Sequence, residues 1–404
     1  MGKIDELIKQ LCPNGIEYHP IGDIMYISDY VSAGSFAAIK KNVQYLAEEN
    51  YAILLRFADF TAGFNRDKFV YINEHAYNFL SKSNIKPGDI IMSNVGSCGS
   101  LFVCPDLGKP MSLAPNSIVI RTNNNNFYYH WFSSYVAQKK IENITSKSAM
   151  PKFNKTELKK ILAPLPPLAV QKEIVEILDT FTRMIDNLQK ELEQRQKQFE
   201  HYRDQMLTFK EGEVQMKPIK EIGKLVRGNG LQKKDFTEDG TGCIHYGQIY
   251  TRFGLSTSST LTFVDSQLAA KLTKVSPGDL VIACTSENIE DVCKSVAWLG
   301  TEDIVTGGHA CVFKHSENPK YIAYCFTTSA FFLQKRKYAY GAKVIDIKTE
   351  KLGEITLPIP SLDKQQEIVD KLDTFEALIS NIKQEIELRQ KQYEYYREKL
   401  LTFE

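Results

Sequence analysis

The sequence contains no run of about 18 apolar residues, the length that a helix needs to span a bilayer. Its first residues, Met1–Glu6, lack the apolar segment of a secretory signal and the hydroxyl residue of a myristoylation motif. We therefore expect a soluble, cytoplasmic protein without membrane contact. With 404 residues, 43% of them hydrophobic and 25% charged, the composition is that of a globular protein of two or more domains.

The cysteines form no C-x-x-C pair, and no histidine lies near them at the spacing of a zinc site. Scattered thiols of this kind stay reduced in the cytoplasm. The sequence therefore predicts neither a disulfide framework nor a metal site. The eight cysteines are Cys12, Cys98, Cys104, Cys243, Cys284, Cys293, Cys311 and Cys325.

Motifs for catalysis are also missing. Gly108–Pro110 lacks the spacing of a phosphate-binding loop, and Gly228–Gly230 lacks the rest of a dinucleotide fingerprint. The segment Asn318–Tyr321 (NPKY) is similar to the catalytic N-P-P-Y of adenine methyltransferases, but it lacks the second proline and a Gly-rich cofactor loop. Asp346–Lys348 has the end of a nuclease metal motif without its partner acidic residue. We therefore expect a binding protein with no catalytic residue, metal or cofactor of its own.

An internal repeat is the strongest positive signal. Residues 166–209 align without a gap with residues 360–403 at an offset of 194, and 24 of the 44 positions are identical. The two cores read EIVEILDTF and EIVDKLDTF, and they are followed by RQKQFEHYR and RQKQYEYYR. This similarity lies far above chance, so the chain contains the same element twice.

Apolar residues recur in each copy at alternating spacings of four and three, which is typical of a coiled-coil seam. Because neither copy is followed by another helix to pair with, we expect an antiparallel pair within the chain. Arg195 and Arg389 also fall on seam positions, and we expect them to set the register or to bond across the pair. The seam residues are Ile174, Leu178, Phe181, Ile185, Leu188 and Leu192, and Ile368, Leu372, Phe375, Ile379, Ile382 and Ile386.

Two mixed segments alternate with these helices. Each contains a Pro-Gly-Asp turn before a β-branched strand, at Pro87–Asp89 and Pro277–Asp279, and we expect both turns to be structural. The sequence thus predicts an α+β fold, in which two mixed α/β domains are separated by two long helices that form an antiparallel intrachain coiled coil with an internal pseudo-two-fold repeat. The expected segments are 1–160 (with a short N-terminal helix), 161–211 (helix), 212–354 and 355–404 (helix).

Positive charge is local, although the net charge is only +1. Residues 139–160 hold seven lysines against two acids, and residues 335–351 hold six basic residues against two. Lysines beside small residues and turns suit the phosphates of a nucleic acid; a solvated helix end is the alternative for either segment. The candidate phosphate contacts are Lys147, Ser148 and Lys152, and Lys335, Lys337 and Lys343.

Base recognition requires side chains with paired donors and acceptors at strand ends and in loops. Ordinary surface polarity is the alternative for each of these residues. In the first domain the candidates are Arg56, Asp59, Asn94 and Ser97. In the second domain they are Arg227, Asn229, Lys233, Lys234, His245, Gln248, Tyr250, Arg252 and Asn288.

Three segments together resemble one known family. They are Pro166–Val175 (PPLAVQKEIV), its partner Ile359–Val369 (IPSLDKQQEIV) and the opening Lys3–Tyr18 (KIDELIKQLCPNGIEY). With these and the duplicated heptad helix, the chain resembles the specificity subunit of bacterial type I restriction-modification systems over essentially its whole length. That family has two target recognition domains alternating with two conserved helices.

The resemblance implies a double-stranded DNA partner. Each recognition domain would read one half of a split, gapped site, and the coiled coil would set the gap. Two methyltransferase subunits would methylate adenine N6 with S-adenosylmethionine, and two ATP- and Mg²⁺-dependent motor-endonuclease subunits would complete the complex. Docking positions on the helices would include Gln189–Lys190, Gln196–Gln198, Lys383–Gln384 and Gln390–Gln392, although solvation alone explains these polar residues equally well.

Two other interpretations remain open. The chain could be the DNA-reading subunit of a type IIB-like enzyme, in which methyltransferase and nuclease are fused. It could also be a coiled-coil scaffold without a DNA role, although basic segments that recur in both halves weigh against this.

Overall fold

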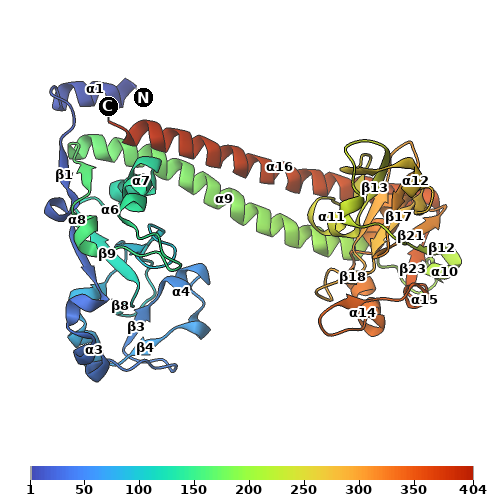
Figure 1. Cartoon of the computed structure of the whole chain (residues 1–404), viewed down its shortest axis with the longest axis horizontal. Coiled ribbons are helices and arrows are strands. Elements are labelled where there is room, and N and C mark those ends of the chain that lie inside the picture. Colours follow the sequence, from blue (N-terminus) through green and yellow to red (C-terminus); the bar gives the residue numbers. More distant parts are fainter. Residues whose placement is uncertain (1, 404) are drawn as a thin grey trace. The chain divides into compact units, whose positions relative to one another are not determined.

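The computed structural model describes residues 2–403. The chain divides into two compact units, each of which holds one mixed domain and part of two long helices (Figure 1). Unit 1 consists of residues 1–188 and 385–404, and unit 2 of residues 189–384. Both mixed domains contain sheets and helices, so the predicted α+β class is confirmed. The division into four segments stays a prediction, because each unit combines a mixed domain with helix segments.

Unit 1 contains two four-stranded sheets, in the strand orders β2-β9-β6-β7 and β4-β3-β8-β5. Ile91 and Val119 of the first sheet pack with Leu55 and Leu113 of the second in one apolar cluster. The first sheet is β2 (Tyr26–Asp29), β9 (Ser117–Arg121), β6 (Ile90–Ser93) and β7 (Leu101–Val103). The second is β4 (Tyr71–Ile72), β3 (Ala52–Leu55), β8 (Met111–Leu113) and β5 (Asn84–Ile85).

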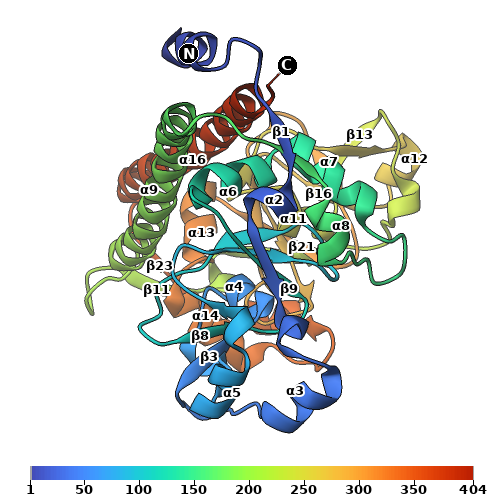
Figure 2. The ribbon, with the colours of Figure 1, turned by 90° about the vertical axis from the view of Figure 1, so that its left-hand side faces the viewer.

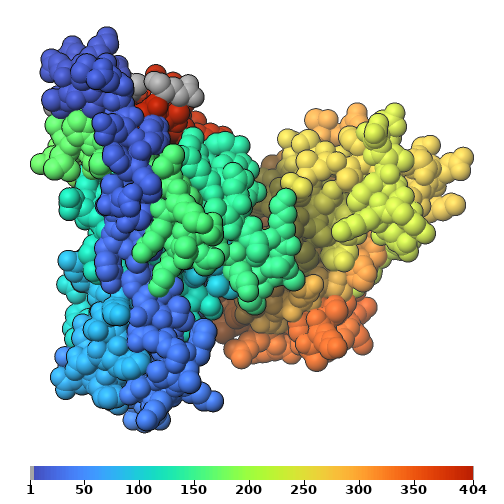
Figure 3. All heavy atoms as spheres, turned by 60° about the vertical axis from the view of Figure 1, so that its left-hand side comes forward, coloured from blue at the N-terminus to red at the C-terminus, as the bar shows by residue number. Residues whose placement is uncertain are grey.

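In unit 1, the N-terminal segment and helices α6, α7 and α8 share one apolar cluster with residues of the long helices. The N-terminal segment runs beside α8, because β1 pairs with β10 and α2 packs on α8 (Figures 2 and 3). These elements are α1 (Gly2–Leu11), β1 (Tyr18–Pro20), α2 (Ile21–Ile24), α8 (Lys155–Lys159) and β10 (Leu162–Pro164). The others are α3 (Phe36–Asn42), α4 (Phe57–Thr61), α5 (Glu74–Phe79), α6 (Asn125–Ser133) and α7 (Tyr135–Ile144).

Unit 2 has a five-stranded sheet, β12-β21-β17-β19-β14, and a four-stranded sheet, β15-β13-β20-β16. The five strands are β12 (Gly223–Arg227), β21 (Ala310–His315), β17 (Leu280–Ala283), β19 (Ser295–Trp298) and β14 (Ser256–Thr257). The four are β15 (Thr262–Val264), β13 (Thr241–Ile244), β20 (Ile304–Thr306) and β16 (Thr273–Val275). Two short pairs join β11 (Gln215–Pro218) to β23 (Thr356–Ile359) and β18 (Thr285–Ser286) to β22 (Ile345–Asp346).

The helices of unit 2 follow a similar order to those of unit 1. α13 and α14 occupy the place in the chain that α6 and α7 occupy in the first half, 194 residues earlier. The second helix of each pair, α7 or α14, begins with a hydroxyl cap. Ser134 accepts from the backbone N–H of Ala137, and Thr328 accepts from that of Phe331. The helices are α10 (Ile219–Ile222), α11 (Tyr246–Thr251), α12 (Ser266–Ala269), α13 (Pro319–Cys325), α14 (Ser329–Tyr338) and α15 (Thr349–Leu352).

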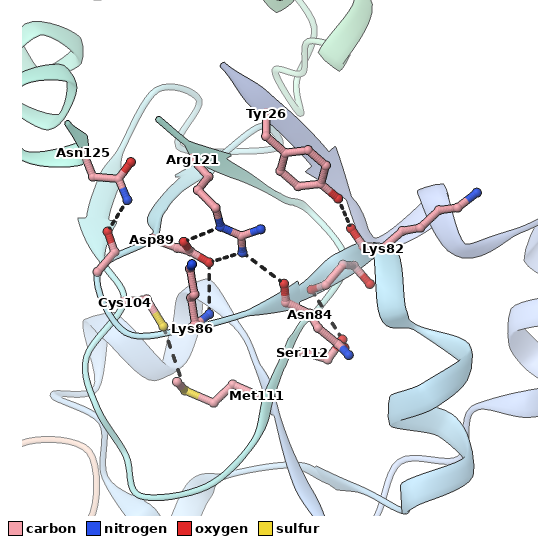
Figure 4. Close-up of polar contacts among 12 residues, drawn as sticks. Tyr26, Lys82, Asn84, Lys86, Asp89, Cys104, Met111, Ser112, Arg121 and Asn125 are labelled. Carbon is pink, nitrogen blue, oxygen red and sulfur yellow. Dashed lines mark hydrogen bonds and ion pairs between the residues drawn. The ribbon is translucent and has the colours of Figure 1, made fainter. Parts of the chain in front are cut away.

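Both Pro-Gly-Asp turns are structural, as predicted. Asp89 is fully buried at the start of β6, and its carboxylate binds the guanidinium of Arg121 on β9 (Figure 4). In unit 2 the carboxylate of Asp279 binds the ammonium of Lys314 on β21 at 3.0 Å. A buried carboxylate requires such a partner, so each turn is fixed to the inner strand that pairs with the strand after it.

The two long helices are α9 (Leu168–Met206) and α16 (Leu362–Leu401). In unit 1 the ring of Phe181 stacks on that of Tyr396 at 5.3 Å, and in unit 2 the ring of Tyr202 stacks on that of Phe375 at 5.5 Å. Because later residues of one helix meet earlier residues of the other, the pair is antiparallel, which confirms the predicted coiled coil (Figure 1).

The seam residues lie mostly in the interior. Eight of the twelve are buried, and Phe181, Leu188, Leu192 and Phe375 are half-buried. The two seam arginines bond within their own helices: Arg195 contacts Glu191 and Gln198, and Arg389 contacts Glu385 and Gln392. The expected bond across the pair is thus replaced by contacts to neighbours three and four residues away, which is the normal spacing along one helix face.

Candidate nucleic-acid interface

In unit 1, two loops lie side by side and carry five of the candidate residues. Val95 pairs with Lys152, and the backbone N–H of Gly96 donates to the carbonyl of Pro151 at 2.8 Å. Asn94 ties the same two loops together, because its side-chain amide donates to the carbonyl of Phe153 at 3.2 Å. Asn94 therefore has a structural partner. Ser97, Lys147, Ser148 and Lys152 are exposed on these two loops.

Arg56 and Asp59 bind each other. The Arg56 Nη2 donates to the Asp59 Oδ1 at 2.5 Å and to the carbonyl of Lys68 at 2.6 Å. The hydrogen bond to Asp59 raises the pKa of the Arg56 guanidinium. Asp59 is only 2% exposed and fully engaged, so we correct the prediction: its carboxylate cannot reach a base, and the pair serves to begin α4.

In unit 2, six candidates line one open cavity of about 930 Å³. They come from the segment around η4 (Lys233–Asp235), from α11 and its caps, and from the loop after β18, and the folded sheets bring these segments together. The sequence did not single out Tyr246, Thr262 or His309, which also line the cavity, because nothing in their local pattern marks them. The six candidates are Lys233, His245, Gln248, Tyr250, Arg252 and Asn288.

The start of α11 orders the polar side chains of this cavity. His245 caps the helix, since its Nδ1 accepts from the backbone N–H of Gly247 at 3.2 Å. Gln248 closes the cap from the other side: its Oε1 accepts from the N–H of His245 at 2.9 Å. Burial lowers the pKa of the His245 imidazole, and the positive charge of Lys233 lowers it further. At neutral pH the imidazole is therefore uncharged, and Arg252, which is exposed, supplies positive charge at the cavity.

Tyr250 and Asn288 are held by the loop after β18. The Tyr250 hydroxyl donates to the carbonyl of Thr285 at 2.5 Å, and burial raises the pKa of that phenol. The Asn288 amide donates to the Asp291 carboxylate at 2.9 Å, while the residue stays exposed. Both side chains thus line the cavity in fixed positions.

The remaining candidates of unit 2 lie outside the cavity lining. The Arg227 guanidinium binds the Asp346 carboxylate at 3.3 Å, and the Asn229 amide donates to the carbonyl of Lys271 at 3.1 Å. Lys234, Lys337 and Lys343 are exposed.

Lys335 requires a correction. Its side chain is 4% exposed, and its ammonium donates to the carbonyls of Glu290 and Val292, both at 2.7 Å. Burial lowers the pKa of this amine. A phosphate cannot reach it, so Lys335 fastens α14 to the loop before β19 and is not part of the interface.

Among residues 2–403, no helix is long and apolar enough to cross a bilayer. In the same part of the chain, no three or more His, Cys, Asp and Glu side chains are grouped in a way that could hold a metal ion.

A family model described as the type I restriction modification DNA specificity domain matches residues 37–195 and again residues 211–388. The chain belongs to this family. The two matches cover most of the sequence, and each includes one mixed domain together with part of a long helix.

Named relatives agree with this assignment. The chain is 35% identical over 258 residues to the Escherichia coli type I restriction enzyme EcoR124I/EcoR124II specificity subunit, an alignment that covers 61% of this chain and 63% of that protein. It is 29% identical over 295 residues to a putative type I restriction enzyme specificity subunit of Haemophilus influenzae, over 69% of this chain and 72% of the relative.

Solved structures share the fold. The S subunit of the type I restriction-modification system of M. genitalium superposes with a TM-score of 0.53 at 14% identity, over 97% of this chain and 98% of that one. A chain from a structure on the assembly and conformational transition of a type I system superposes with a TM-score of 0.59 at 14% identity, over 96% and 97%. At this identity the likeness concerns the fold alone.

Proposed function

We propose that this chain is the sequence-reading subunit of a type I restriction-modification complex and that each mixed domain binds one half of a split double-stranded DNA site. The observation that carries the proposal is the duplicated arrangement. Two recognition domains, which differ in sequence, are each attached to the same antiparallel helix pair. Two different readers of this kind suit two different half-sites in inverted orientation.

The exposed lysines on the loops after α7 and α14 are suited to the phosphate backbone, which supplies affinity and register. The cavity of unit 2 supplies donors and acceptors for base edges: Arg252 suits guanine, and Gln248 or Asn288 suits adenine. In this proposal the coiled coil fixes the number of base pairs between the two half-sites, because a helix pair has a fixed rise per residue.

The proposed partners are two methyltransferase subunits and two motor-endonuclease subunits. S-adenosylmethionine, ATP and Mg²⁺ belong to those partners in this account, and the present chain carries out no reaction itself. The exposed polar positions Gln189–Lys190 and Gln196–Gln198, with their copies in α16, are the proposed docking positions on the helices.

A type IIB-like assembly is the second candidate, since the same reading subunit could serve a fused methyltransferase-nuclease. Only the identity of the partner subunits separates the two proposals. Purification of the complex from its natural source, followed by identification of its subunits, would decide between them.

The experiment that tests the proposal is methylome sequencing. A host without its own system would express the cognate methyltransferase subunit with this chain and, as the control, without it. The proposal predicts an N6-methyladenine motif in two parts with a fixed gap, present only when this chain is expressed. Methylation of the same sites without this chain would contradict it.

A further inference from the structure

The loops that follow α7 and α14 are closed by the same backbone hydrogen bond. In unit 1 the N–H of Ser146 donates to the carbonyl of Lys152 at 2.9 Å. In unit 2 the N–H of Tyr340 donates to the carbonyl of Asp346 at 3.0 Å. Both pairs of positions differ by 194, the offset of the helix repeat. We call residues 146–152 and 340–346 the tip loops.

Each tip loop is also fastened to the centre of its own domain. Lys152 pairs with Val95 in the loop after β6, and Asp346 pairs with Thr285 of β18, the short strand after β17. The closing hydrogen bond and this antiparallel pairing hold both ends of each loop. The positions of the residues between them are therefore fixed relative to the domain.

The fifth residue of each tip loop is apolar and exposed. Met150 is 66% exposed and Val344 is 58% exposed, and these positions also differ by 194. Single exposed apolar residues are common on protein surfaces and need no explanation. Here, however, an exposed apolar residue recurs at the same position of two loops that are closed in the same way, although the two domains differ in sequence. This recurrence calls for an explanation.

The conformation of each tip loop is fixed beside this apolar residue. The Ser148 hydroxyl donates to the carbonyl of Met150 at 2.7 Å. In unit 2, Gly341 has a φ of +118°, and a Cβ at that position would lie 1.9 Å from the carbonyl oxygen of Val344. Only glycine permits this close approach.

The surroundings of both tips are those of a polyanion site. Lys147 and Lys152 flank Met150, and Lys343 precedes Val344; all three are exposed. Val344 also lines the cavity that holds Arg252 and Asn288. An apolar tip beside cations and base-edge donors suits a DNA groove, whose rim carries phosphates and whose floor presents polar base edges and the methyl groups of thymine.

We propose that Met150 and Val344 enter a DNA groove and contact base pairs directly, one in each half-site. The proposal rests on the proposed function. The lysines of the tip loops hold the phosphates, while the apolar tip meets base edges, for which the methyl group of thymine is the matching surface. The tips thus contribute specificity and non-ionic affinity.

The test is a salt titration of DNA binding by the chain in complex with its methyltransferase subunits. The probe is a duplex carrying the motif found by methylome sequencing. We expect Met150→Ala and Val344→Ala each to weaken binding about tenfold, the order of an apolar side chain of this size. The slope of log affinity against log salt should not change, because no phosphate contact is lost. Lys147→Ala should instead lower that slope by about one.

The matched control is Met216→Ala, which removes another exposed methionine (54%, against 66% for Met150) from β11. The proposal would be overturned if Met150→Ala and Val344→Ala bound the duplex with wild-type affinity or with a changed salt slope. It would also be overturned if Met216→Ala lost as much affinity as they did. Thermal melting of each variant excludes unfolding as the cause. The proposed function is judged separately, on whether the wild-type complex prefers the motif duplex to a scrambled one.

Discussion

The imidazole Nε2 of His130 on α6 lies 2.8 Å from the carboxylate of Asp179 on α9. His130 is 2% exposed, and its other ring nitrogen bonds the hydroxyl of Tyr393 at 2.9 Å. In unit 2 the Tyr324 hydroxyl donates to Asp373 at 2.8 Å. The same aspartate of the repeat therefore attaches each recognition domain to its helices, but through a different side chain.

Removal of this attachment should loosen one unit only. Asp179→Ala leaves a buried imidazole nitrogen without its partner, which costs about 1–3 kcal/mol. We expect faster amide hydrogen exchange in α6 and α7, with exchange in unit 2 unchanged. Glu176→Ala, which removes an exposed carboxylate from the same helix, is the control and should have no effect. Equal exchange in both variants would show that the contact does not hold the domain.

The stability of unit 2 should fall in mild acid. Burial lowers the pKa of the His315 imidazole below its usual 6.5, so the unfolded chain binds a proton at a pH where the folded chain does not. Stability is therefore complete above about pH 6.5 and decreases as the pH falls below that value. Denaturant midpoints at pH 7.5 and 5.5 measure this loss.

We expect His315→Gln to reduce the pH dependence, because the uncharged amide has no proton to bind. His75→Gln, at an exposed histidine of unit 1, is the control and should keep the wild-type profile. If His315→Gln keeps the wild-type dependence of stability on pH, other groups cause the acid sensitivity.

Arg252 tests base recognition in the cavity of unit 2. Arg252→Ala should relax discrimination at one base pair of the second half-site by about 1–3 kcal/mol and leave the first half-site unchanged. Arg252→Lys is the sharper variant, since it keeps the charge but loses the paired donors. If Arg252→Ala instead weakens binding equally to all sequences and Arg252→Lys restores that affinity, Arg252 contacts a phosphate and not a base.

Lengthening the helix pair tests whether it sets the number of base pairs between the two half-sites. Phe181 meets Tyr396 and Tyr202 meets Phe375, so an insertion after Leu188 is matched by one after Leu388. One heptad in both helices adds about 10.5 Å, or about three base pairs. Methylome sequencing should show both half-sites unchanged and the gap longer by about three. An unchanged gap would contradict the role of the helices in spacing.

The helices were predictable from sequence because heptad periodicity is a local property. The cavity of unit 2 was not: His245, Arg252 and Asn288 attract notice singly, but their convergence depends on sheet pairing between distant segments. Lys335 was misjudged for the same reason. A lysine within a basic run is normally exposed, and only the carbonyls of Glu290 and Val292, brought close by folding, account for its burial.

The central claim is that each half of the chain reads its own half of the site. Its most direct measurement is methylome sequencing with a chimaera in which residues 1–162 are replaced by those of another specificity subunit with a different motif. The account predicts that one half of the gapped motif changes to that of the donor, while the other half stays as it was. A change in both halves, or in neither, in an active complex would contradict it.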